Sequence, residues 1–113
     1  MANSVGFHEA QEQLNPKTLE LHRALTSLME ELEAIDWYQQ RVDATKDPQL
    51  REILKHNRDE EIEHAMMVLE WLRRNDEVFA RQLEHIVGKP GPIVHAEERE
   101  EAAGKIPPPG RKE

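Results

Sequence analysis

The chain has 113 residues, 34% charged and 37% hydrophobic, which is enough for one small domain with a thin core. It has no cysteine, which excludes disulfides, thiolate zinc sites and iron–sulfur clusters and leaves carboxylates and imidazoles as metal ligands. The formal net charge of −8 argues against nucleic acid as a partner, because phosphates would be repelled. No segment resembles a signal peptide or a bilayer span, so we expect a soluble cytoplasmic protein that binds no membrane.

A first long helix is predicted to begin at Asn15-Pro16. Residues 1–14 are polar and irregular, and we expect them to form a flexible N-terminus. At Asn15-Pro16 a capping side chain is followed by proline at the first helical position. No proline or glycine then interrupts the chain up to about Asp43. The apolar residues of this segment alternate steps of four and three, the period of one helical face: Leu21, Leu25, Leu28, Leu32 and Ile35.

A second long helix follows after a short turn. Asp47-Pro48 repeats the cap-then-proline pattern, which predicts a turn over residues 44–47 and a helix to about Asn75. A short third helix is predicted over residues 76–85, ending before Gly88. We therefore expect an all-α fold: an antiparallel two-helix hairpin plus a short C-terminal helix, together spanning residues 15–87. Residues 88–113, with an acidic run and closing prolines, are expected to form a disordered tail.

Such a hairpin cannot bury its apolar surface alone, because each helix gains only one neighbour. The second helix has an apolar stripe of its own, formed by Leu50, Ile53, Leu54, Val68, Trp71 and Leu72. A further apolar set lies away from the main stripes of both helices: Leu19, Trp37, Ile62, Met66 and Leu69. Apolar residues on two sides of a two-helix unit predict association with further helices.

Polar residues interrupt the stripe of the second helix. At about 100° per residue, Asn57, Glu61 and His64 lie within about 40° of the stripe's centre. An unpaired carboxylate taken out of water costs several kcal/mol, so something must compensate for it. Glu61 and His64 form Glu-x-x-His, which places an oxygen and a nitrogen on one helical face, close enough to bind one metal ion.

Glu31 of the first helix is predicted to lie level with Glu61. In an antiparallel hairpin, residues equidistant from the centre of the turn lie at the same height. With the centre near 45.5, Glu31 is about 14.5 positions before it and Glu61 about 15.5 after it. Glu31 lies on the shoulder of the buried face, and Tyr38 lies on the same side, where it could hydrogen-bond to a ligand.

These residues make up half of a known metal-binding set. The di-iron carboxylate site of four-helix bundles takes one Glu from each of two helices and Glu-x-x-His from each of the other two. This chain supplies one of each, so two copies related by a two-fold axis would complete the set. We therefore predict dimerisation into a ferritin-like four-helix bundle.

The same pattern leaves other functions open. Asn57, Glu61 and His64 would also suit a structural helical oligomer in which buried polar groups set the register. A metal-binding module without redox turnover, holding zinc or manganese, has the same ligand types. A rubrerythrin-like peroxidase is disfavoured, because no cysteine is present to hold a rubredoxin iron. His22, His56 and His85 show no ligand spacing and are expected at the surface.

Two segments resemble the encapsulated ferritins, the cargo iron oxidases of encapsulin nanocompartments. They are MEELEAIDWYQQRVDA at residues 29–44 and HNRDEEIEHAMMVLEWLRRN at residues 56–75, and the resemblance extends over residues 15–87. It implies a two-helix chain with a short third helix, assembled into an annular decamer that is a pentamer of dimers. Members of the family usually end in a short targeting peptide with Gly, Leu and other apolar residues, which Ile106–Glu113 does not resemble.

The resemblance also implies an activity and its residues. The activity is oxidation of Fe(II) to Fe(III) by dioxygen at a di-iron centre between two subunits, with Glu31, Glu61 and His64 as ligands and Tyr38 beside them. Glu30 and Glu33, which spacing alone assigns to a solvated acidic face, would form an uptake site for Ca²⁺ or other divalent ions. An encapsulin shell in the cytoplasm would be the partner, and the iron mineral would be stored inside it.

Overall fold

The computed structural model describes residues 6–94 and is all-helical over that range, without strands. A short 3-10 turn, η1 (Gln11–Gln13), precedes the helices α1 (Pro16–Ala44), α2 (Pro48–Asn75) and α3 (Glu77–Ile86). The predicted all-α fold and its three helices are confirmed. The expectation for the tail from residue 95 onward, including Ile106–Glu113, lies outside the described residues.

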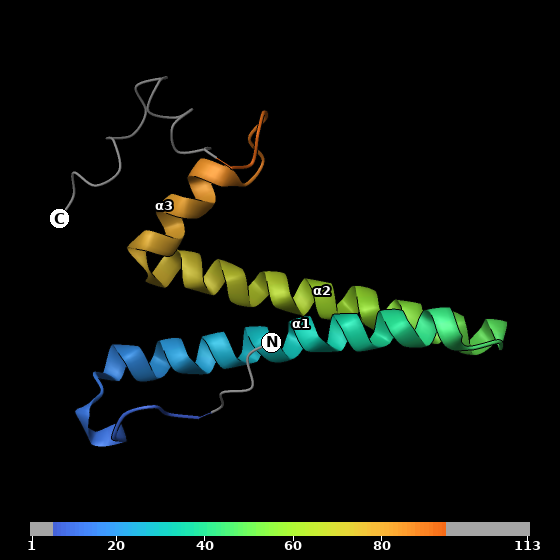
Figure 1. Cartoon of the computed structure of the whole chain (residues 1–113), viewed down its shortest axis with the longest axis horizontal. Coiled ribbons are helices and arrows are strands. Elements are labelled where there is room, and N and C mark those ends of the chain that lie inside the picture. The colour runs from blue at the N-terminus through green and yellow to red at the C-terminus, as the bar shows by residue number, and fades with distance from the viewer. Residues whose placement is uncertain (1–5, 95–113) are drawn as a thin grey trace. The chain divides into compact units, whose positions relative to one another are not determined.

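The chain divides into two compact units, Met1–Trp71 and Leu72–Glu113. In the first unit, α1 and α2 run antiparallel side by side and are joined by the turn at residues 45–47, as Figure 1 shows. The second unit contains the last turn of α2 and the whole of α3. The candidate site described below lies entirely within the first unit.

The two long helices begin differently from each other. The Asp47 side chain accepts hydrogen bonds from the backbone N–H groups of Gln49 at 3.0 Å and Leu50 at 3.4 Å, so its predicted capping role is confirmed. Asn15 occupies the capping position of α1, but its side chain makes no capping hydrogen bond, so that part of the prediction was wrong. Pro16 alone accounts for the start of α1, because its φ is already helical and it has no N–H to satisfy.

Helix α3 has a cap at its start and a glycine after its end. The Asp76 side chain accepts from the N–H groups of Val78 and Phe79, both at 3.0 Å. The backbone is already extended at Val87, and Gly88 then has a φ of +76°, a left-handed conformation that favours glycine. His85 in the last turn of α3 is only 4% exposed, so the expectation of a surface residue was wrong. An imidazole has a largely apolar body, and a lack of ligand spacing says nothing about its burial.

Arg51, in the first turn of α2, holds the C-terminal end of α1. Its Nε donates to the Val42 carbonyl at 3.1 Å, and its Nη2 donates to the Thr45 carbonyl. Carbonyls at the end of a helix lack intrahelical partners and carry the negative end of the helix dipole. One cation from α2 therefore satisfies two carbonyls and holds the turn that sets Glu31 against Glu61.

Replacing Arg51 by alanine is expected to lower the free energy of unfolding by about 1–2 kcal/mol, because two carbonyls lose a charged donor. Urea denaturation followed by circular dichroism measures the change. Arg51→Lys keeps the charge but loses the two-pronged donor, so it should recover only part of the stability. An Arg51→Ala protein that unfolds at the wild-type urea concentration would show that these contacts contribute nothing.

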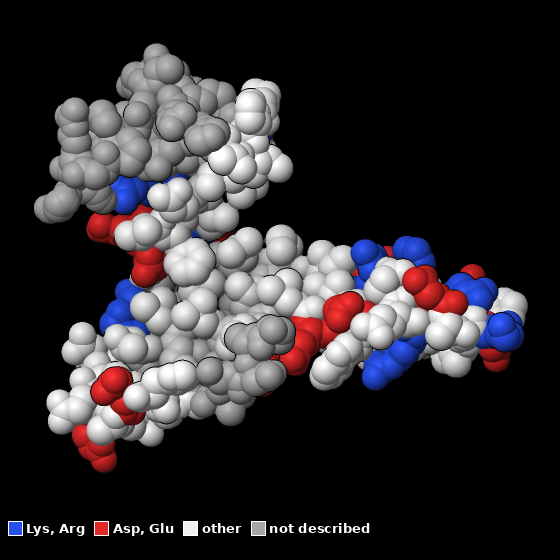
Figure 2. All heavy atoms as spheres, viewed as in Figure 1, with Lys and Arg blue, Asp and Glu red and all other residues white. Residues whose placement is uncertain are grey.

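Large apolar side chains remain exposed on the hairpin. Members of both predicted stripes are among them, because each helix has a single neighbour within the hairpin and its remaining sides stay uncovered. Figure 2 shows acidic and basic side chains interspersed at the turn end of the hairpin. Within residues 6–94, no helix is long and apolar enough to cross a membrane. The exposed apolar residues of α1 and α2 are Leu25, Met29, Leu32, Trp37, Leu50, Ile53, Met66, Met67 and Trp71.

Candidate metal centre

Helices α1 and α2 bring Glu31, Glu61 and His64 together. One potential ligand atom of each lies within 4.8 Å of those of the other two. The Nδ1 atom of His64 is 3.6 Å from Oε1 of Glu31 and 3.5 Å from Oε1 of Glu61. Glu31 and Glu61 thus lie at the same level of the hairpin, as the antiparallel register requires, and the three-residue spacing places His64 beside Glu61.

The three side chains are half-buried rather than fully buried. The exposed fractions are 25% for the Glu31 side chain, 23% for Glu61 and 42% for His64. The sequence pattern placed Asn57, Glu61 and His64 on the most buried line of α2, and this was wrong for the single chain. A two-helix unit covers that line from one side only, so it remains partly open.

Glu61 perturbs the ionisation of Glu31 in the absence of a cation. The pKa of Glu31 is raised, first by its hydrogen bond with the Glu61 carboxyl, then by burial and by the negative charge of Glu61. His64 acts in the opposite direction but does not cancel the effect. A divalent cation between the two carboxylates would relieve this repulsion. Two carboxylates and an imidazole therefore fit a ferrous ion, and also zinc or manganese, both in charge and in ligand type.

The raised pKa predicts how pH affects the metal-free protein. The folded state holds the Glu31 proton more tightly than the unfolded chain does. This favours folding below the unfolded-state pKa, and the benefit is lost as pH rises through the raised pKa. Glu31→Gln removes this dependence, so the metal-free variant should be more stable than wild type near neutral pH. Urea denaturation in a chelator at about pH 4 and about pH 7 compares the two proteins.

The stability advantage of Glu31→Gln over wild type should shrink on acidification, because Glu31 of the wild-type protein becomes protonated. A variant that is less stable than wild type at neutral pH, and equal to it in acid, would contradict the sign of the shift. Acidification should weaken metal binding by the wild-type protein, because protons compete with the ion for Glu31. Because the pKa of Glu31 is raised, this weakening should begin at a higher pH than it would for a glutamate with an ordinary pKa.

An open groove follows the ligand group along the same side of the hairpin. Ser27 precedes Glu31 by four residues and Val68 follows His64 by four, so groove and ligands face the same way. The ligand group therefore lies on a side of the hairpin that offers apolar surface to a partner. The groove has a volume of about 370 Å³ and is lined by Glu20, Arg23, Ala24, Ser27, Met67, Val68 and Trp71.

The other expected site residues lie outside the ligand group. Tyr38 is half-buried and follows Glu31 by seven residues, about 10 Å along α1. The Arg41 guanidinium lies 5.4 Å from the centre of its ring. Among residues 6–94 the Tyr38 hydroxyl has no hydrogen bond to a ligand, so the expected contact is not present in the single chain. Glu30 and Glu33 are exposed on α1.

Glu60 is a neighbour of the site that the sequence analysis missed. Its Oε1 is 4.0 Å from Nε2 of His64, and its Oε2 is 3.9 Å from Nε2 of His56. His56 is exposed as expected, but it is paired. The available signal was the spacing, since His56, Glu60 and His64 follow one another at intervals of four residues.

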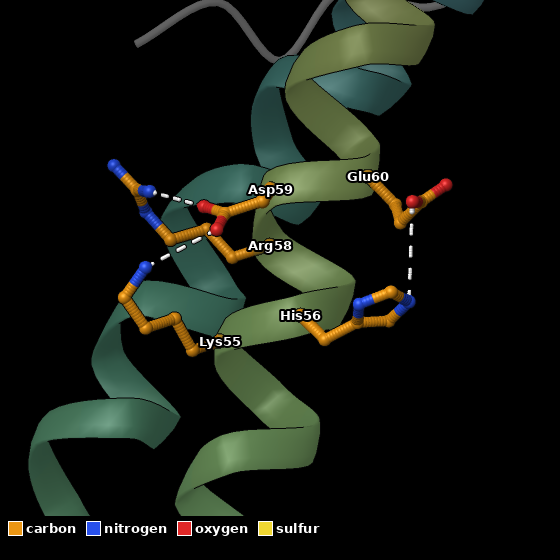
Figure 3. A network of polar contacts seen from close by, with 5 residues as sticks. All are labelled: Lys55, His56, Arg58, Asp59 and Glu60. Atoms are coloured by element: carbon orange, nitrogen blue, oxygen red, sulfur yellow. Dashed lines mark hydrogen bonds and ion pairs between the residues drawn. The ribbon is translucent and has the colours of Figure 1, made fainter.

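Figure 3 shows Glu60 and His56 together on one side of α2, with a separate ion-pair cluster on the other side of the helix. In that cluster Asp59 accepts from Lys55 at 3.1 Å and from Arg58 at 2.8 Å. The hydrogen bond from Lys55, followed by that from Arg58, holds the pKa of Asp59 below its ordinary value. Lys55 and Arg58 thus contact Asp59, whereas Glu60 lies near the two imidazoles.

The profile of the EncFtn-like family matches residues 6–89, a range that includes all three α-helices. The chain belongs to this family. An encapsulated ferritin-like protein from Rhodospirillum rubrum is 56% identical to it over 95 residues, 84% of this chain and 68% of that protein. A ferritin-like protein from Thermotoga maritima is 50% identical over 92 residues, 81% of each chain.

A solved structure supports the fold of this EncFtn-like chain. The crystal structure of a protein from Nitrosomonas europaea matches it with a TM-score of 0.76 at 50% sequence identity. The match covers 80% of this chain and 100% of that chain. The helical arrangement is therefore shared over the whole length of that protein.

Proposed function

We propose that this chain is one half of a ferroxidase, which oxidises Fe(II) to Fe(III) with dioxygen once two copies have paired. The proposal rests on one observation: Glu31, Glu61 and His64 lie together on an open side of a two-helix hairpin. They are half of the ligand set that a di-iron carboxylate site draws from four helices. A second copy, related by a two-fold axis, would supply the same three residues again.

The chemistry of the donors supports iron as the substrate. Carboxylate oxygens and an imidazole suit ferrous iron. The hydrogen bond with Glu61, then burial and the negative charge of Glu61 raise the pKa of Glu31, and a cation would offset that charge. Two Fe(II) ions held side by side can each lose one electron to the same dioxygen. In the simplest balance, two Fe(II), one dioxygen and two protons yield two Fe(III) and one hydrogen peroxide. Glu31, Glu61 and His64 contribute by holding the ions close together.

Further assembly follows from the same proposal. The exposed apolar residues on both helices favour association beyond a single pair, and we propose the annular decamer. The relative from Rhodospirillum rubrum is named an encapsulated ferritin-like protein, which supports an encapsulin shell in the cytoplasm as the partner. Glu30 and Glu33, exposed on α1 beside Glu31, would take up Ca²⁺ or other divalent ions, and Tyr38 would adjoin the centre in the assembled protein.

An anaerobic titration of the purified oligomer with Fe(II), followed by stopped-flow absorbance on mixing with aerated buffer, tests the proposal. We expect binding to saturate at about one iron per chain, half of a di-iron site, followed by fast oxidation. Tight binding of Fe(II) without fast oxidation would replace the ferroxidase by a non-redox metal-binding module. No tight binding would leave a structural helical oligomer.

A further inference from the structure

We propose that Glu60 is a positioning residue, which holds the His64 ring so that Nδ1 faces the metal. The inference rests on the proposed function, because it concerns the same centre. The two ring nitrogens of His64 lie near different carboxylates. Nδ1 is 3.6 Å from Glu31 and 3.5 Å from Glu61, whereas Nε2 is 4.0 Å from Oε1 of Glu60.

An imidazole binds a metal ion only through a nitrogen that carries no proton, so the proton must sit on the other nitrogen. Nδ1 of His64 faces the two carboxylates that would share the ion, and this assigns the proton to Nε2. The carboxylate of Glu60 is the acidic group on that side, 4.0 Å from Nε2. Metal-binding histidines usually have a hydrogen-bond acceptor at that nitrogen, which fixes both the orientation of the ring and the position of its proton.

The distance of 4.0 Å is longer than a hydrogen bond, so in the single chain the contact is electrostatic. Both residues are on α2, four positions apart, so their side chains lie on the same face of the helix. The other oxygen of this carboxylate lies near His56, whose Nε2 is 3.9 Å from Oε2 of Glu60, as drawn in Figure 3. Glu60 therefore lies between two imidazoles, with one oxygen directed at each.

The effect of Glu60 should appear in metal binding and not in folding. Exposed pairs of this kind contribute little to stability. Residues that orient a metal ligand, by contrast, typically change metal affinity by about 10–100-fold when they are replaced. Thermal unfolding of the metal-free Glu60 variants should therefore match that of wild type.

The test uses Zn²⁺ as a probe without redox chemistry, the full chain, and three variants. Glu60→Ala removes the acceptor, and we expect Zn²⁺ affinity to fall about 10-fold or more in competition with a chelator. Glu60→Gln removes the charge but keeps an amide oxygen that accepts from Nε2–H, so it should retain most of the affinity. Glu63→Gln, an exposed neighbour on α2, removes the same charge without facing His64 and is the matched control.

Solid-state NMR of protein labelled with ¹⁵N at histidine gives the second readout, with His64→Ala identifying the signals. Wild type loaded with Zn²⁺ should show His64 bound through Nδ1 and protonated at Nε2, and Glu60→Ala should show a mixture of ring states. Wild-type affinity and ring state in Glu60→Ala would overturn the inference. An equal loss of affinity in all three variants would also overturn it, because net charge would then account for the effect.

The two proposals fail in different ways. A wild-type protein that binds Zn²⁺ at His64 but does not oxidise Fe(II) rapidly would overturn the ferroxidase and leave the role of Glu60 standing. A wild-type protein that binds neither ion would overturn both. Fast iron oxidation with unchanged metal affinity and ring state in Glu60→Ala would overturn only the positioning role.

Discussion

Replacing Ile53 by glutamate is expected to leave the hairpin folded but to abolish pairing and iron oxidation together. Ile53 is 53% exposed in the chain, so a glutamate there can stay hydrated before assembly. It lies on the same side of α2 as His64 but about 16 Å along the helix, too far to disturb the ligands directly. Burying the new carboxylate in a subunit interface would cost several kcal/mol, more than about a hundred-fold in the association constant.

Analytical ultracentrifugation, circular dichroism and stopped-flow iron oxidation measure the three consequences for Ile53→Glu. Lys46→Gln is the matched control, because it changes the net charge by the same amount at an exposed residue of the turn. It should assemble and oxidise iron as wild type does. An Ile53→Glu chain that is monomeric yet fully active would show that the centre is complete within one chain.

Replacing Glu61 by alanine should affect metal binding and folding in opposite directions. Loss of a ligand should weaken Fe(II) binding by at least about 100-fold, the upper end of the effect of residues that merely orient ligands. The fast oxidation phase should be lost with it. The metal-free protein should be no less stable than wild type near neutral pH, because removing Glu61 removes both the hydrogen bond and the negative charge that raise the pKa of Glu31.

The stability of the metal-free Glu61→Ala protein shows whether Glu61 is a metal ligand or a structural residue. If Glu61 served only to set the register of a helical oligomer, Glu61→Ala would destabilise the metal-free protein and break its assembly. Glu63→Ala, two residues further along α2 and exposed, makes the same change of side chain and charge away from the ligand group. It should bind and oxidise iron at the wild-type rate.

Much of the hairpin could be predicted because local signals determine it. A proline after a polar residue marks the start of both long helices, and the three-residue turn between them fixes which residues are level. The meeting of Glu31 with Glu61 needed nothing more than that turn and the helical rise. The Glu-x-x-His spacing then placed His64 beside Glu61 without any tertiary information.

What could not be predicted depends on how many neighbours each helix has. Asn57, Glu61 and His64 on α2 are only half-buried in the single chain. Their burial depends on partners outside the chain, which the periodicity of the sequence does not reveal. The burial of His85 depends on what surrounds α3, which the spacing of histidines does not reveal. The contact of Glu60 with His64 was visible as a four-residue spacing, but such pairs are common on acidic helices and only the geometry of the His64 ring singles this one out.

The register of the hairpin also has a consequence for folding kinetics. Glu31 and Glu61 are 30 residues apart in sequence, and the helices that carry them are joined by the short turn at residues 45–47. Contacts of such low sequence separation form quickly, since little loop entropy is lost in closing the chain. Each chain should therefore bring its own three ligand residues together as it folds, before it meets another chain. Encounter between chains would then join two preformed halves, and the slow, concentration-dependent step would be docking and not folding.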